Sequence, residues 1–218
     1  MIRLENVNKR YESGHEALKN INLFIPRGEL VFLTGHSGAG KTTLLKLLLL
    51  IERSTRGKIT LDNQSLESVR NKHIPFLRRK IGMIFQDHRL LMERTIFDNV
   101  ALPLILEGYS DTDIGKRVRA ALDKVGLLGR EKSYPMALST GERQRVGIAR
   151  ALVHKPPIIL ADEPTGNLDP KLAQETFDLF QEFNQVGVTV LVATHNLGMI
   201  AKMRHRILTL ENGNLIAE

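Results

Sequence analysis

The chain has no cysteine and no tryptophan among its 218 residues, and aromatic residues make up only 5% of it. Without cysteine there is no disulfide framework, no Cys-based zinc site and no thiol nucleophile, which suits a reducing compartment. The scarcity of aromatic residues also disfavours a surface that stacks on nucleic-acid bases. We therefore expect no nucleic-acid partner.

The sequence also lacks a long apolar run. The longest, Leu44–Ile51, is interrupted by Lys46 and reaches less than half of the roughly 20 residues that a membrane-spanning helix needs. The first residues, Met1–Asn6, carry charge where a signal peptide would have an apolar segment. We expect a protein that stays in the cytoplasm.

Positive charge is in excess, with a net charge of +7 and an isoelectric point near 9.8. Such an excess can serve anionic lipid or nucleic acid, although basic runs are more often solvated faces. The basic residues gather in two runs: Arg70, Lys72, Arg78, Arg79 and Lys80, and then Lys202, Arg204 and Arg206.

Two kinds of strand are predicted. Residues 2–7 and 21–25 alternate between apolar and polar, which indicates antiparallel strands around a turn at Gly14. Continuously apolar runs indicate strands buried on both faces, and these lie at 29–34, 81–85, 158–161 and 188–193. A short strand at 58–61 and a Leu-rich helix over 42–52 complete this part. Buried strands that alternate with helices are typical of a parallel α/β sheet.

Between these strands, residues 87–154 lack strong strand signals and contain helical patterns. Ser110 and Asp113 predict a capping box that opens a helix ending near Gly126. The connection over 70–79 is largely polar. We therefore expect a single domain in which an α/β core, 1–86 and 155–218, carries a helical insertion over 87–154.

One motif points to phosphate binding. The segment 35–42 reads G-x-x-x-x-G-K-[ST] and lies between a buried strand and a helix, which is the arrangement of a P-loop. Backbone N–H groups and the helix dipole favour an anion there, Lys41 would pair with the β- and γ-phosphates, and the Thr42 hydroxyl would bind Mg²⁺. The expected nucleotide contacts are Gly35, His36, Ser37, Gly38, Ala39, Gly40, Lys41, Thr42 and Thr43.

A second helix start about a hundred residues later has the same character. Ser139 and Glu142 predict a capping box, and Gly141 lies between them. One nucleotide needs only one such site, so this helix start calls for a separate explanation.

Polar residues follow three further buried strands. Asp162 and Glu163 come after one strand, where Asp162 would hold Mg²⁺ and Glu163 would orient the water that attacks the γ-phosphate. Gln86 ends another strand, which would place its amide near Mg²⁺ and the water. His195 follows the last, where its imidazole would contact the γ-phosphate. We expect all of these strand ends to converge on the P-loop edge, and Tyr11 is a candidate for stacking on adenine.

Taken in order, these segments resemble the ATP-binding subunit of ATP-binding-cassette (ABC) transporters over essentially the whole chain. The resemblance rests on Tyr11, 35–42, Gln86, the signature 138–142, 158–163, 166–169 and His195. It implies an α/β P-loop NTPase fold with a mixed sheet core, an N-terminal antiparallel β part and an inserted α-helical subdomain. It also implies a head-to-tail homodimer in which the signature of one copy closes over ATP held by the other, which would explain the second helix start.

Within this family the segments 35–41, 81–88, 90–92 and 98–100 are most similar to the cell-division branch. That resemblance implies an integral, permease-like membrane partner of the FtsX type, control of cell-wall hydrolysis, and peripheral association with the inner membrane. ATPases of lipoprotein-releasing and macrolide exporters share 162–169 and remain an alternative. A nucleic-acid-associated ABC ATPase is a further alternative of another class.

Two positions depart from the family pattern. Thr140 stands where the signature usually has glycine, and Asn196 stands where aspartate commonly follows the histidine. Thr140 adds a Cβ and a hydroxyl beside the expected phosphate contact. We expect it to affect turnover and closure more than ATP binding.

Overall fold

The computed structural model describes residues 1–166, 168–201 and 203–217. Asn167 and Lys202, both part of segments singled out above, lie outside the described residues. The chain forms two compact units, 1–78 together with 179–218, and 79–178. Each unit is described separately below.

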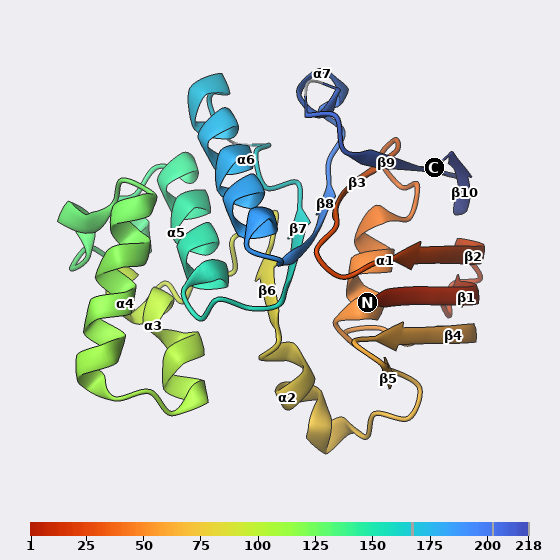
Figure 1. Ribbon diagram of the computed structural model, residues 1–218, viewed down its shortest axis with the longest axis horizontal. Coiled ribbons are helices and arrows are strands. Elements are labelled where there is room, and N and C mark those ends of the chain that lie inside the picture. Colours follow the sequence, from red (N-terminus) through yellow and green to blue (C-terminus); the bar gives the residue numbers. More distant parts are fainter. Residues whose placement is uncertain (167, 202, 218) are drawn as a thin grey trace. The chain divides into compact units, whose positions relative to one another are not determined.

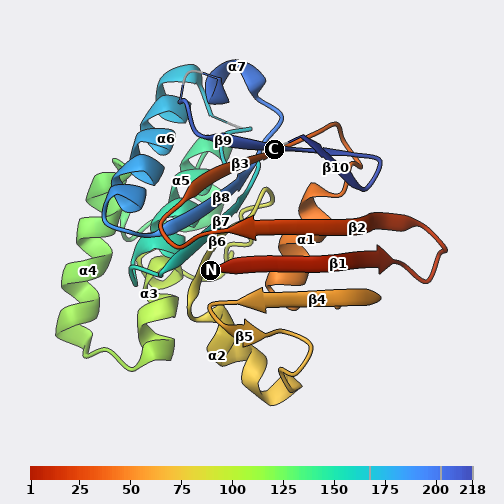
Figure 2. The same ribbon diagram turned by 45° about the vertical axis from the view of Figure 1, so that its right-hand side comes forward.

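The first unit opens with an antiparallel sheet. Its strands are β1 (Ile2–Arg10), β2 (Glu16–Ile25), β4 (Arg56–Leu61) and β5 (Gln64–Ser65), in the order β2-β1-β4-β5. Figure 1 and Figure 2 both show β1 lying between β2 and β4. Ile2 and Leu4 are buried whereas Arg3 and Glu5 are exposed, because alternate side chains point to opposite faces of a strand. The predicted antiparallel pairing is confirmed.

The same unit contains the parallel strands that carry the P-loop. Strand β3 (Leu30–Thr34) pairs in parallel with both β8 (Thr189–Ala193) and β9 (Arg206–Glu211), and β10 (Asn214–Ala217) runs antiparallel to β9. Every residue of β3 and β8 is buried, which explains their continuously apolar sequences. The parallel α/β arrangement predicted from these runs is confirmed, whereas β9 and β10 were not predicted.

Short helices complete the first unit. They are α1 (Lys41–Leu48), the 3₁₀ turn η1 (Asn71–His73), α2 (Ile74–Arg78) and α7 (Leu197–Ile200). Helix α1 ends four residues earlier than predicted, and the Arg78 guanidinium donates to the carbonyls of Leu49 (2.9 Å) and Leu50 (3.1 Å) just beyond that end. Arg78, expected only as part of a basic run in a polar connection, therefore satisfies carbonyl groups that a helix end leaves unpaired.

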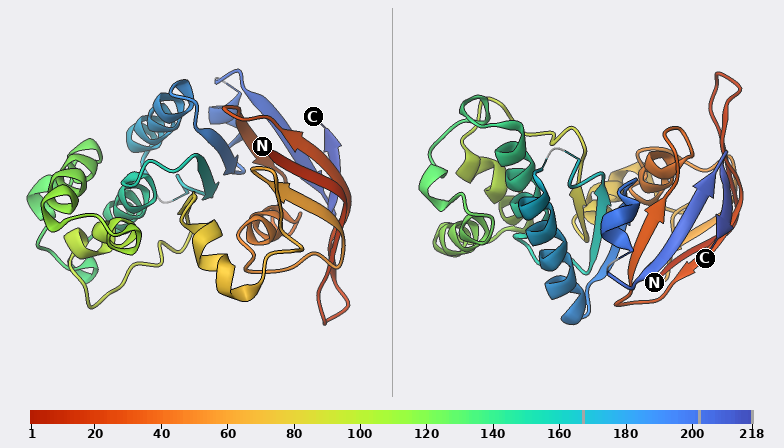
Figure 3. Two further views of the ribbon diagram at one scale, coloured as in Figure 1. Left: turned by 60° about the horizontal axis from the view of Figure 1, so that its bottom comes forward. Right: turned by 90° about the horizontal axis from the view of Figure 1, so that it is seen from above.

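The described residues of the second unit form parallel strands, α-helices and short 3₁₀ turns. Strand β6 (Ile81–Ile84) pairs with β7 (Ile158–Asp162), and between them lie α3 (Ile96–Glu107), α4 (Asp111–Lys124), η2 (Leu128–Arg130), η3 (Pro135–Ala137) and α5 (Thr140–Leu152). Figure 3 shows α3, α4 and α5 grouped together. All of residues 87–154 are described, and none of them forms a strand, as the sequence predicted. Helix α6 (Pro170–Gln185) extends from this unit into the first.

The helix starts test the capping predictions. Ser139 and Glu142 form the reciprocal capping box that was predicted, and Asp169 caps α6 by accepting from the N–H groups of Lys171 and Leu172. At α4 only half of the predicted box forms: the Ser110 hydroxyl accepts from the Asp113 N–H, but the Asp113 carboxylate binds that hydroxyl rather than the backbone. A further capping box, formed by Thr95 and Asp98, was not predicted.

Among the described residues, none of the helices has the length and the apolar character that a membrane span requires.

Candidate nucleotide-binding site

The P-loop connects β3 to α1 in the first unit, and two of its glycines have no substitute. Gly35 has a φ of 146°, and a Cβ there would lie 2.2 Å from the Leu210 carbonyl oxygen. Gly40, the N-cap of α1, has a φ of 113°, and its Cβ would lie 2.6 Å from the Ala17 carbonyl oxygen. Because the backbone packs tightly around this loop and both positions have positive φ, only glycine fits at either position.

The start of α1 is suited to an anion. Gly40 supplies no side-chain cap, so the first N–H groups of the helix have no side-chain partner. The Lys41 ammonium lies inside the loop, 2.7 Å from the Gly35 carbonyl oxygen and 3.1 Å from that of His36. His36, Ser37, Gly38 and Thr42 are exposed, whereas Ala39 and Lys41 are buried. Backbone donors, a helix dipole and a held ammonium together fit the phosphates of a nucleotide.

Tyr11 is connected to this helix. Its hydroxyl lies 3.2 Å from the Thr43 hydroxyl, and the Lys9 ammonium lies 4.8 Å from the centre of its ring. Lys9 is itself fixed by the Glu52 carboxylate at 2.7 Å. Because a cation already occupies one face of the ring, an adenine could stack only on the opposite face.

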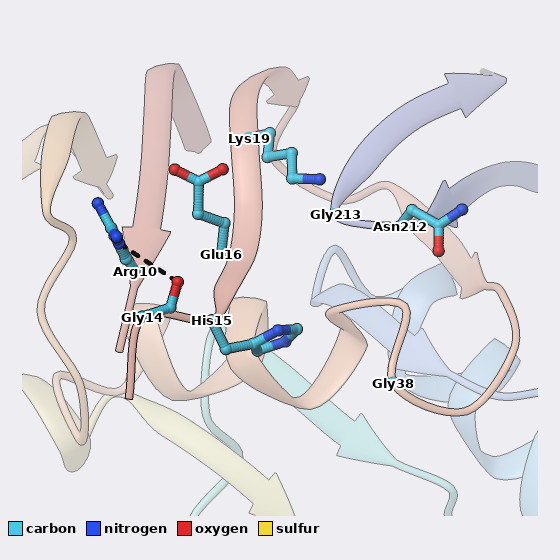
Figure 4. A pocket seen from close by; sticks show the side chains of 8 residues that line it. All are labelled: Arg10, Gly14, His15, Glu16, Lys19, Gly38, Asn212 and Gly213. Atoms are coloured by element: carbon cyan, nitrogen blue, oxygen red, sulfur yellow. Dashed lines mark hydrogen bonds between the residues drawn. The ribbon is translucent and has the colours of Figure 1, made fainter. Parts of the chain in front are cut away.

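An open cavity of about 620 Å³ lies beside the tip of the P-loop. Its lining residues come from the β1–β2 hairpin, the turn at 212–213 and Gly38 (Figure 4). The His15 ring and the Lys19 ammonium extend toward Gly38 and Gly213, whereas the Arg10 guanidinium turns back to the Gly14 carbonyl at 3.3 Å. His15 and Lys19 were not predicted as site residues; the signal in the sequence that could have found them is a pair of basic residues close to a hairpin turn.

His195 leaves the same sheet edge as the P-loop. Leu33 pairs with Ala193 in the parallel strands β3 and β8. Gly35 lies two residues beyond Leu33, and His195 lies two residues beyond Ala193. The departure at Asn196 has a local role, since its side-chain oxygen accepts from the Met199 N–H at 3.2 Å and caps α7. The prediction that these two strand ends share an edge is confirmed.

A matching arrangement exists in the second unit. Ile84 pairs with Ala161 in β6 and β7. Gln86 lies two residues beyond Ile84, whereas Asp162 and Glu163 lie one and two residues beyond Ala161. Asp162 is buried, Gln86 is exposed, and Glu163 has a left-handed backbone with a φ of 47°. A non-glycine residue in that conformation is uncommon and often marks a functional position.

The start of α5 is different in kind from that of α1. The Ser139 hydroxyl accepts from the Glu142 N–H, and the Glu142 carboxylate accepts from the Ser139 N–H at 2.8 Å. Hydrogen bonds to its carboxylate from the Ser139 backbone and side chain hold the pKa of Glu142 below its usual value. The Thr140 hydroxyl accepts from Arg143 at 3.1 Å. An anion at this helix start would therefore meet the Ser139 hydroxyl and the N–H groups of Thr140 and Gly141.

Each unit thus gathers part of the predicted site. The first holds the P-loop, Tyr11 and His195, and the second holds Gln86, Asp162, Glu163 and the α5 start. Convergence of all strand ends on one nucleotide stays a prediction, as do the predicted boundaries of the insertion. In the described part of the chain, no group of three or more histidines or acidic residues forms a metal site. The predicted Mg²⁺ ligands, a hydroxyl, an amide and one carboxylate, would not form such a group.

Comparison with known proteins places this geometry in a family. The ABC transporter family model matches residues 18–166. The cell division ATP-binding protein FtsE of Escherichia coli K12 is 57% identical over 99% of this chain and 97% of its own length, and FtsE of Haemophilus influenzae is 48% identical over 99% of both. A solved dimeric, post-hydrolysis structure of the ATP-binding cassette MJ0796, bound to ADP and Pi, matches with a TM-score of 0.94 at 38% identity, covering 99% of this chain and 96% of that one.

These matches extend over nearly the whole chain and agree with the P-loop described above. They confirm the predicted fold, an α/β P-loop NTPase of the ABC type with an antiparallel N-terminal sheet. The chain therefore belongs to the ABC transporter family and is an ATP-binding, ATP-hydrolysing subunit of it.

Proposed function

We propose that this chain is the ATPase of a bacterial cell-division complex, in which it drives an FtsX-like integral membrane subunit that regulates cell-wall hydrolysis. The observation that carries this proposal is the 57% identity to a cell division ATP-binding protein over 99% of the chain. Relatives with the same name in Haemophilus influenzae and Bacillus subtilis support it at 48% and 42% identity. The chain would lie on the cytoplasmic face of the inner membrane as a peripheral subunit.

In this proposal the first unit binds the nucleotide. The N–H groups at the start of α1 and the Lys41 ammonium hold the phosphates, and Tyr11 stacks on the adenine with the ring face away from Lys9. The positive charge of Lys19 at the neighbouring cavity adds to the attraction for the anionic nucleotide. His195 contacts the γ-phosphate from the adjacent strand end.

The second unit supplies the hydrolytic groups. Glu163 accepts a hydrogen bond from the attacking water, and its left-handed backbone fixes the carboxylate after β7. Together with Thr42 of the first unit, Gln86 and Asp162 would hold Mg²⁺, which would offset the charge that develops on the phosphates. Because Asp162 is buried and Gln86 exposed, the carboxylate provides the fixed ligand and the amide the adjustable one.

Two helix starts of different kinds support a dimer. The α1 start has no side-chain cap, whereas the α5 start satisfies part of its own backbone through the Ser139–Glu142 box. We infer that α5 meets the nucleotide of a second copy, with two Mg-ATP between head-to-tail subunits. The Glu142 carboxylate can only accept hydrogen bonds, so it suits a hydroxyl of the nucleotide better than a phosphate.

Replacing Glu163 by glutamine tests the catalytic assignment and the dimer together. We expect E163Q to keep its ATP affinity, to lose about 10²- to 10⁴-fold in kcat, and to sediment as a dimer with Mg-ATP. For the unchanged chain, turnover per subunit should rise with protein concentration. Full turnover by E163Q would overturn the role of Glu163, and full turnover by a monomer would overturn the dimer.

The second unit also offers a surface for the membrane partner. Leu91 and Met92 are 46% and 43% exposed, with the partly buried Leu90 and Phe85 near them in sequence. The Arg89 guanidinium covers one face of Phe85 at 4.3 Å, so within this segment Leu91 and Met92 offer the most apolar surface to a cytoplasmic helix. Capture of membrane subunits by E163Q with Mg-ATP, compared with L91E in the same background, would identify the partner. An FtsX-like subunit supports the proposal, and an exporter permease contradicts it.

A further inference from the structure

The segment that carries Gln86 is held in an unusual conformation. His88 and Arg89, which follow Gln86 closely, are consecutive non-glycine residues with left-handed φ values of 58° and 48°. Such residues keep this conformation only where their surroundings impose it. In this unit those surroundings include α5, the helix that begins after Ser139.

Arg150, in the last turn of α5, binds the backbone of this segment. Its guanidinium donates to the carbonyl oxygens of His88 at 2.6 Å and Arg89 at 2.7 Å. Burial lowers the pKa of Arg150, and the two carbonyls offset the cost of burying its charge. A guanidinium can hold two adjacent carbonyls because its donors are fixed in one plane, so these bonds define the direction of the chain at His88.

His88 makes a second connection to α5 through its side chain. Its Nδ1 lies 2.5 Å from Oε1 of Gln144, which is 1% exposed. In the described chain, Nε2 of Gln144 has no hydrogen-bond partner. The bond to His88 is therefore the one that holds the buried Gln144 amide, and its loss would leave that amide without a partner.

Together these contacts join two parts of the proposed mechanism. Gln144 lies two residues beyond Glu142, the end of the Ser139–Glu142 box, and the clamp formed by His88, Gln144 and Arg150 connects α5 to the segment of Gln86. We propose that His88 is a positioning residue for ATP hydrolysis, which transmits the position of the α5 start to the Gln86 amide. This inference rests on the proposed roles of Gln86 and of the α5 start.

Substitution of His88 separates this role from a purely structural one. We expect H88A to lose about tenfold to a hundredfold in kcat, while the Kd for Mg-ATP changes less than twofold. H88N should recover most of the kcat, because its side-chain amide can donate to Gln144 from a similar position and asparagine tolerates left-handed φ. In the H88A/Q144A pair, the double variant should lose little more than either single variant.

Amide hydrogen exchange in the full-length chain gives a second readout. H88A should increase exchange over 85–90 and over 140–143, and H88N should restore it. G147A is the matched control on the same helix, since its new Cβ would lie 3.9 Å from the His88 carbonyl oxygen, an ordinary contact that breaks no bond. We expect G147A to keep both kcat and the exchange pattern.

The possible results separate this inference from the proposed function. If Q86A loses turnover while H88A keeps it, the positioning role of His88 is overturned and the proposed function stands. If Q86A keeps turnover, the proposed role of Gln86 fails. Hydrogen exchange in H88A then tests whether the clamp connects the two segments. Coupled changes over 85–90 and 140–143 support that connection, and independent changes overturn it. Faster exchange in H88A with unchanged kcat would reduce His88 to a structural residue.

Discussion

The hydroxyl of Tyr11 lies 3.2 Å from the hydroxyl of Thr43, which connects the end of the first strand to the helix of the P-loop. The ring and the hydroxyl of Tyr11 therefore have separable roles. We expect Y11A to weaken ATP binding about tenfold, because an aromatic ring stacked on a base contributes about 1–3 kcal/mol. Y11F should stay within threefold of the unchanged chain, since it keeps the ring.

Titration calorimetry with Mg-ATP would measure both affinities. Tyr109, whose ring packs against Arg117 at 4.6 Å in the other unit, provides the control Y109A, which should bind ATP normally. Unchanged affinity in Y11A would remove Tyr11 from the site. A loss in Y11F as large as in Y11A would assign the effect to the hydroxyl contact with Thr43.

Two P-loop glycines, Gly40 and Gly38, form a graded test of the loop backbone, with Gly129 of η2 as the control. G40A forces a Cβ to within 2.6 Å of the Ala17 carbonyl oxygen, G38A meets nothing within 4 Å but has a φ of 80°, and G129A is unobstructed without positive φ. We expect G40A to destabilise the fold by about 2–3 kcal/mol and G38A by about 1 kcal/mol, because steric overlap adds to backbone strain only at Gly40.

Urea unfolding midpoints would rank the three variants, with G129A close to the unchanged chain. Mg-ATP binding should fall in the same order. If G40A were as stable as G129A, the backbone around the loop would be less rigid than its contacts indicate.

How far the fold follows from the sequence depends on the length of each signal. The buried strands β3, β7 and β8 were predicted because their apolar runs are continuous, and every residue of these strands is buried. Strand β10 was missed because it has only four residues at the end of the sheet. Helix α2 was read as a connection because it is short and contains Pro75, although proline is tolerated in the first turn of a helix.

In the site, too, features set by one segment of the sequence were predicted, and features formed by segments far apart in the sequence were not. Gln86 and Glu163 were correctly predicted to lie at one edge of the sheet, because each follows a strand and neighbouring parallel strands end on the same side. The cavity at Lys19 could not be predicted, since it forms only where the β1–β2 hairpin meets the turn at 212–213. The His88–Gln144 hydrogen bond joins residues that are 56 positions apart in the sequence, and no sequence motif predicts it.

The Ser139–Glu142 box predicts a stability that depends on pH. Its hydrogen bonds lower the pKa of Glu142 in the folded chain, so the stabilisation is complete above the unfolded value, about 4.3, and is lost as pH falls through the lower folded value. We expect S139A to be less stable than the unchanged chain by about 1 kcal/mol at pH 7, with a smaller difference below pH 4.

Urea unfolding at several pH values would give that difference, and carbon NMR of the Glu142 carboxyl would give its pKa directly. In S139A this pKa should return toward its ordinary value. The Ser110 cap of α4, replaced in S110A, is the comparison, because Asp113 there binds only the side chain. An unshifted Glu142 pKa in the unchanged chain would contradict the prediction.

The departure at Thr140 should affect turnover rather than binding. Its hydroxyl accepts from Arg143 at 3.1 Å, and its Cβ stands at the first position of α5, beside the proposed contact with a second copy. T140G removes both, so we expect kcat to change severalfold while the ATP affinity of the monomer stays the same. T140S keeps the hydroxyl and should resemble the unchanged chain if the Arg143 bond is the cause. Changed affinity with unchanged kcat would place Thr140 in the nucleotide site of its own subunit.

Reversing the charge of Lys19 tests the cavity beside the P-loop. K19E replaces a cation that lines this cavity together with Gly38, and we expect it to weaken Mg-ATP binding severalfold at low salt. The effect should shrink as ionic strength rises, because salt screens charges at exposed sites over about 10 Å at 0.1 M. K124E, on helix α4 of the other unit, makes the same change of net charge as a control. Equal losses in K19E and K124E would indicate a general effect of net charge, whereas a loss confined to K19E would assign it to the cavity.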